Sequence, residues 1–91
     1  MRIDKYLKVS RLVKRRSVGK ELCDCGKILV NGKVIKGSCE VKTGDIIEVI
    51  FGSRLTKVKV LEVREVVKKE DVGELYELLE SRRTEVESNE G

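Results

Sequence analysis

Residues 26–35 read GKILVNGKVI: a glycine and a lysine, an apolar triplet, a two-residue turn and a second short apolar stretch. Asn31-Gly32 is a strong short-range signal for a β-hairpin, because both turn residues need positive φ. Gly26 stands where a helix requires a left-handed residue after its last turn. The stretch therefore predicts a helix that ends near residue 25, followed by a hairpin of residues 28–30 and 33–35.

A short helix is expected at the start of the chain, over residues 2–9. Ile3, Tyr6 and Leu7 are spaced i, i+3, i+4 and form one apolar stripe. Asp4 can pair with Lys8 one turn later.

A second helix is expected to begin at Ser17, whose hydroxyl can cap the first turn, and to end before Gly26. Val18, Leu22 and Cys25 would line its apolar face at i, i+4, i+7. Residues 11–16 form a basic connector between the two helices, in which Leu12 and Val13 are expected to enter the core.

The remaining elements follow from changes of hydrophobic period. Residues 46–51 read IIEVIF and predict a strand, and residues 56–67 alternate with a phase shift that suggests a bulge or a bend. Helical spacing of apolar residues predicts a C-terminal helix over residues 72–83. We therefore expect an α+β fold, in which two short N-terminal helices pack on a small, mostly antiparallel sheet and a C-terminal helix follows.

The predicted organisation is a single domain. Residues 1–51 would form the core of the domain, residues 52–83 a strand-and-helix extension of the same domain, and residues 84–91 a disordered acidic tail.

Composition argues against several classes of protein. The chain has no histidine and only three cysteines, so neither a catalytic set nor a four-ligand zinc site assembles, and we expect no cofactor, no bound metal and reduced thiols. No apolar run approaches the roughly 18 residues of a membrane span. Charges interrupt the N-terminus where a secretory signal would be apolar, so a cytoplasmic location is expected.

Charge is segregated along the chain. Residues 1–36 contain eleven Lys and Arg against three Asp and Glu, whereas residues 70–91 contain two against eight. A solubilising surface would be expected to mix both signs throughout. The basic first third favours a polyanionic partner.

Four segments together resemble the RNA-binding S4 domain, also called the alpha-L motif, in order and spacing. They are RIDKYL at 2–7, RLVKRRS at 11–17, GKILVNGKV at 26–34 and VKTGDII at 41–47. The free-standing form is similar to the heat-shock protein fifteen group, and within it to the short proteins of ribosome-associated quality control.

The resemblance implies an RNA-facing surface on the two helices and their connector. Its residues would be Arg2, Lys5, Arg11, Lys14, Arg15, Arg16, Ser17, Lys20 and Lys27. Asp4 would orient a neighbouring cation, or else form a simple surface pair on the helix. Because the chain has few aromatic residues, recognition of RNA shape and backbone is favoured over stacking of splayed bases.

The implied partners are ribosomal RNA of the large subunit, peptidyl-tRNA on an obstructed large subunit, and a tRNA-recruiting quality-control factor that helps to tail the stalled chain. A ribosome-associated monomer without catalytic activity and without a membrane partner is expected. Two alternatives stay open at this point. The chain could be an assembly factor for precursor ribosomal RNA, or a protein-interaction module that uses its acidic C-terminus.

Overall fold

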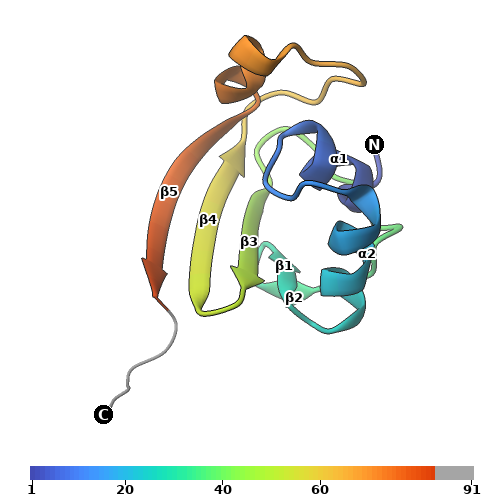
Figure 1. The fold of residues 1–91 in the computed structure, drawn as a ribbon, viewed down its shortest axis with the longest axis vertical. Helices are drawn as coiled ribbons and strands as arrows, with labels where there is room; N and C mark the ends of the chain where they lie inside the picture. The colour runs from blue at the N-terminus through green and yellow to red at the C-terminus, as the bar shows by residue number, and fades with distance from the viewer. Residues whose placement is uncertain (84–91) are drawn as a thin grey trace.

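The computed structural model describes residues 1–83, which form two short helices beside a five-stranded antiparallel sheet (Figure 1). The sheet order is β2-β1-β3-β4-β5, and β5 lies at the edge away from both helices (Figure 1). The elements are α1 (Ile3–Val9), α2 (Arg16–Asp24), β1 (Ile28–Val30), β2 (Lys33–Val34), β3 (Ile46–Phe51), β4 (Arg54–Val60), the 3-10 helix η1 (Lys69–Glu74) and β5 (Tyr76–Arg83). The predicted α+β class with an antiparallel sheet is confirmed.

The predicted hairpin forms from β1 and β2. Asn31 and Gly32 have φ values of 54° and 84°, as the turn requires. The Asn31 side chain also donates to Asp45 over 3.1 Å and accepts from the backbone N–H of Ile46 over 2.9 Å. One asparagine therefore shapes the turn and holds the start of β3 against it.

The two helices pack closely because α2 has a glycine at the contact. A Cβ on Gly19 would lie 3.3 Å from a methyl carbon of Leu7 and 3.4 Å from the backbone oxygen of Asp4. The buried face of α2 is formed by Gly19 and Cys23. Cys25, which was expected on this face, is exposed, because α2 ends at Asp24 and Cys25 is its C-cap.

The core lies between the helices and the sheet. Its fully buried members come from α1 (Ile3, Tyr6 and Leu7), from the strands (Ile28, Ile47, Val58 and Val60) and from the segment before β5 (Leu75). Of the two connector residues predicted to enter the core, Val13 is buried and Leu12 is half-buried against it.

The prediction of a C-terminal helix over residues 72–83 was wrong. Residues 69–74 form η1, and Tyr76–Arg83 form β5, which pairs with β4 along its whole length. Leu75 is fully buried, whereas Leu79, which should share its helical stripe, is 44% exposed. The strand forms because β4 would otherwise present an unpaired edge, and pairing satisfies its backbone groups.

The predicted irregularity after residue 56 has a different position and cause. β4 ends at Val60, so Leu61 and Val63 belong to the segment that leads to η1 rather than to a bulged strand. The register shift lies between Lys57 and Val58, where β5 contributes Leu79 as the additional residue. The expected tail over residues 84–91 lies outside the described residues.

Candidate nucleic-acid interface

A buried carboxylate joins the starts of the two helices. Asp4, in the first turn of α1, is 2% exposed and accepts from Arg2 over 3.1 Å and from Arg16 over 3.2 Å. Arg2 is the N-cap of α1, and Arg16 is the first residue of α2. Each arginine keeps nearly half of its side chain exposed, 44% and 48%. A single anion thus fixes two guanidinium groups while leaving both accessible.

The aliphatic stem of Lys20 lies near the same carboxylate, while its ammonium pairs with Asp24 over 3.5 Å. A Cβ on Gly37 would be 3.4 Å from Cγ of Lys20 and 3.5 Å from a carboxylate oxygen of Asp4, so both side chains border this glycine. The backbone N–H of Asp4 donates to the Gly37 carbonyl over 3.3 Å. We call Arg2, Asp4, Arg16 and Lys20 the Asp4 cluster.

Asp4 does not pair with Lys8, as the helical spacing had suggested. The two arginines take its oxygens instead, because Arg2 precedes α1 and the connector returns Arg16 to the same helix end.

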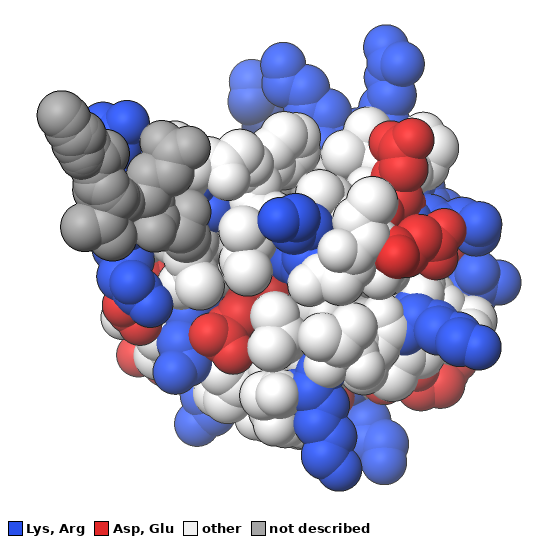
Figure 2. Space-filling model, turned by 90° about the horizontal axis from the view of Figure 1, so that it is seen from below, with Lys and Arg blue, Asp and Glu red and all other residues white. Residues whose placement is uncertain are grey.

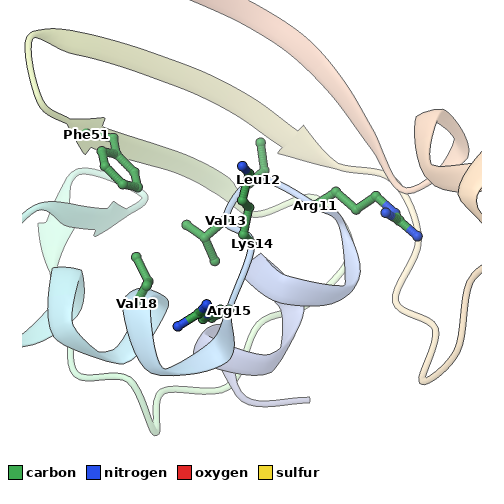
Figure 3. Close-up of a pocket in the computed structure, with 7 residues that line it drawn as sticks. All are labelled: Arg11, Leu12, Val13, Lys14, Arg15, Val18 and Phe51. Atoms are coloured by element: carbon green, nitrogen blue, oxygen red, sulfur yellow. The ribbon is translucent and has the colours of Figure 1, made fainter.

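The connector forms a second basic feature next to the Asp4 cluster. Three exposed cations, Arg11, Lys14 and Arg15, line a hollow of about 580 Å³, together with Leu12, Val13, Val18 and Phe51. We call it the connector hollow. Figure 3 shows Phe51 at one end and Arg11 at the other, with Leu12, Val13 and Lys14 between them. None of its seven lining residues is acidic.

Three of the predicted site residues belong to neither the Asp4 cluster nor the connector hollow: Lys5, Ser17 and Lys27. Ser17 is exposed in the first turn of α2 but is not its N-cap, because the helix begins at Arg16 and the Arg15 carbonyl accepts the first bonds. Lys5 forms an ion pair with Glu65, from the segment between β4 and η1. Lys27 is exposed between α2 and β1.

The positive charge is not confined to one side. Seen from the lower end of Figure 1, lysine and arginine side chains project around most of the outline, with acidic side chains among them (Figure 2). On this face the two signs are mixed, although the sequence segregates them. The Asp4 cluster and the connector hollow are the places where cations of the first third gather.

Two ionisable groups near these features have shifted pKa values. Burial, with the nearby Asp4 and Asp24 charges, raises the pKa of the Cys23 thiol to about 11. The Lys5 ammonium lowers the pKa of the Glu65 carboxyl through their ion pair. Cys23 is therefore a protonated structural thiol at neutral pH, and Glu65 is ionised.

Within residues 1–83, no group of three or more potential metal-ligating side chains comes together. No helix in that part of the chain is long and apolar enough to cross a membrane.

Comparison with known proteins agrees with this architecture. A model of the S4 domain matches residues 1–47. A curated protein of Streptococcus pneumoniae, named RQC P-site tRNA stabilizing factor, is 51% identical over 93% of this chain and 97% of its own length. The chain belongs to this S4-domain family. A factor of the same name from Halalkalibacterium halodurans is 50% identical over 86% of this chain and 89% of its own.

A solved structure of another protein has a similar fold. The structure of heat shock protein 15 from Vibrio cholerae, described as trimeric, superimposes with a TM-score of 0.81 at 25% identity and covers 87% of this chain and 81% of that one. The S4-domain match contains α1, the connector, α2 and the β1–β2 hairpin, and it includes every basic residue of the Asp4 cluster and the connector hollow.

Phe51 is the one lining residue of the connector hollow that lies outside the S4-domain match. Sequence reasoning assigned it only to a strand. Its place at the exposed end of that strand, before Gly52, was the available signal that its ring would not be fully buried.

Proposed function

We propose that this chain is a non-catalytic RNA-binding factor of ribosome-associated quality control. It would bind ribosomal RNA and peptidyl-tRNA on obstructed large ribosomal subunits and act together with a tRNA-recruiting factor. The support is the S4 domain together with relatives whose name describes stabilisation of P-site tRNA.

The observation that carries this proposal is the Asp4 cluster. A guanidinium can donate two parallel hydrogen bonds to a phosphate, but an isolated surface arginine must first lose its rotamer freedom. Arg2 and Arg16 are already held by Asp4, and close to half of each side chain faces solvent. The buried carboxylate reduces the net charge, but it prepares both donors for binding.

The connector adds three exposed cations to this surface. Among residues 1–83, Arg11, Lys14 and Arg15 form no ion pair, so a phosphate would not have to displace a paired carboxylate from them. Two of the three aromatic residues, Tyr6 and Tyr76, are buried or half-buried. This surface suits the backbone and shape of folded RNA.

Co-sedimentation with large ribosomal subunits that carry peptidyl-tRNA tests the proposal. The double variant Lys14→Ala/Arg15→Ala removes two exposed cations, and binding should weaken by about 10-fold to 100-fold, as expected for lost charge-assisted hydrogen bonds. The slope of log K against log salt should become shallower by about 1.5, the share of two phosphates. Thermal stability should not change.

A matched control is Arg82→Ala/Arg83→Ala, which removes two adjacent exposed arginines from β5. It should bind subunits like the unmodified protein. Equal losses in both double variants would indicate non-specific charge attraction and would contradict the assigned surface.

A further inference from the structure

The connector hollow has two kinds of wall. Leu12, Val13 and Val18 form an apolar wall with Phe51, and the lining cations supply positive charge. Phe51 is 54% exposed at the end of β3, although aromatic rings are usually covered in folded proteins. A ligand that fits both walls has a flat apolar part and a negatively charged part.

An unpaired nucleotide has both parts. Its base can stack on an aromatic ring, and its phosphates can bind lysine and arginine. The volume of about 580 Å³ falls within the range of roughly 300–1,000 Å³ that small-molecule sites occupy. Arg11 lies at the opposite end of the hollow and its side chain extends away from Phe51 (Figure 3), so Lys14 and Arg15 are the cations that the phosphates would meet.

We propose that the connector hollow holds one unpaired base of the bound RNA, stacked on Phe51, with the adjoining phosphates on Lys14 and Arg15. This inference rests on the proposed function and adds contact with a base, which the sequence did not predict. The rest of the surface would bind the backbone of folded RNA, and this hollow would bind a single base that is displaced from the fold.

A second hollow in the molecule provides a control. It has a volume of about 360 Å³, and its lining includes the half-exposed Leu79, one lysine (Lys57) and one glutamate (Glu48). Glu48 and Phe51 are an odd number of residues apart on β3, so they face opposite sides of the sheet. Because Glu48 offsets the charge of Lys57, this hollow should not hold the phosphates of a nucleotide, with or without an aromatic ring.

The chain contains no tryptophan, so a single substitution introduces the one tryptophan of the chain. Phe51→Trp keeps an aromatic ring in the connector hollow, and Leu79→Trp places one in the control hollow. Both variants are titrated with large ribosomal subunits that carry peptidyl-tRNA, and co-sedimentation is measured in parallel. The unmodified protein is titrated in the same way, and its signal is subtracted, because ribosomal proteins also emit. Stacking should quench the emission of Phe51→Trp on binding and leave that of Leu79→Trp unchanged.

An affinity series gives a second readout. Phe51→Leu keeps an apolar side chain but removes the ring, and it should weaken binding about 5-fold to 150-fold, the range for loss of one base stack. Phe51→Trp should bind as well as the unmodified protein. Because the ring is uncharged, the salt dependence of Phe51→Leu should keep its slope, unlike that of the Lys14→Ala/Arg15→Ala variant.

The outcomes separate the two proposals. Co-sedimentation of both tryptophan variants without selective quenching, or unchanged affinity of Phe51→Leu, would overturn the base-binding role and leave the proposed function standing. Failure of the unmodified protein to bind subunits would overturn both.

Discussion

The hydroxyl of Tyr6 in α1 donates a 2.8 Å hydrogen bond to the backbone carbonyl of Leu75, 69 residues later in the chain. Both residues are fully buried. The same carbonyl accepts from the backbone N–H groups of Leu61 and Glu62 over 2.8 and 3.1 Å. One oxygen therefore ties the first helix to the segment that follows β4 and to the start of β5.

Tyr6→Phe should lower the free energy of unfolding by about 0.5–1.5 kcal/mol, the usual net value of one hydrogen bond. The loss should be no larger, because two backbone donors still satisfy the Leu75 carbonyl. Urea denaturation measures it. Tyr76→Phe is the control, since the Tyr76 hydroxyl donates no hydrogen bond within residues 1–83. An equal loss in both variants would contradict the assigned role of the Tyr6 hydroxyl.

Asp4→Asn should weaken subunit binding by about tenfold, even though it makes the chain more positive. The two arginines would lose the anion that positions them, and the free energy of unfolding should fall by about 1–3 kcal/mol. Asp24→Asn makes the same charge change at an exposed pair with Lys20 and should bind normally or slightly better. Tighter binding by Asp4→Asn would show that net charge, rather than arginine position, controls affinity.

Glu65→Gln should strengthen subunit binding by about 2-fold to 5-fold. The change releases Lys5 from its ion pair, and a screened surface contact with one phosphate is worth about 0.5–1 kcal/mol. The gain should disappear at high salt. Glu80→Gln removes an equal charge from β5 and is the control. No difference between the two variants would place Lys5 outside the RNA surface.

Cys23 should make stability depend on pH in the alkaline range. Its pKa is raised to about 11 in the folded protein against 9.0 for an ordinary thiol, so only the unfolded chain loses this proton between those values. Stability should therefore fall as pH rises through that range. Cys23→Ala should flatten the decline and Cys25→Ala should not, as followed by urea denaturation.

Alkylation gives an independent check on the same thiol. Exposed Cys25 should react with iodoacetamide in the native protein, whereas buried Cys23 should react only after unfolding. Rapid native alkylation of Cys23 would contradict its burial.

Local signals predicted the N-terminal half of the fold well. Gly26 at φ 72°, the Asn31-Gly32 turn and the strand over residues 46–51 all depend on residues adjacent in sequence. The C-terminal error had a non-local cause. The spacing of Leu75 and Leu79 suits a helix, but the state of this segment depends on β4, which offers an edge that no local pattern reveals.

The basic residues of the candidate site could be selected from the sequence, but their pairing could not. Asp4 and Arg16 are 12 residues apart, and only the packing of the two helices shows that they meet. Lys5 looked equivalent to the other cations because its partner, Glu65, is 60 residues away. Phe51 was missed because its exposure depends on how far the connector covers the end of β3.

The core crosses the boundary of the S4-domain match. Val58, Val60 and Leu75 are fully buried, yet all three lie beyond residue 47. A graft of residues 1–47 onto another protein would leave Ile3, Tyr6 and Leu7 facing water unless the host supplied equivalent apolar cover. Engineers who wish to move this RNA-binding element should therefore transplant the chain through at least Leu75, strands included.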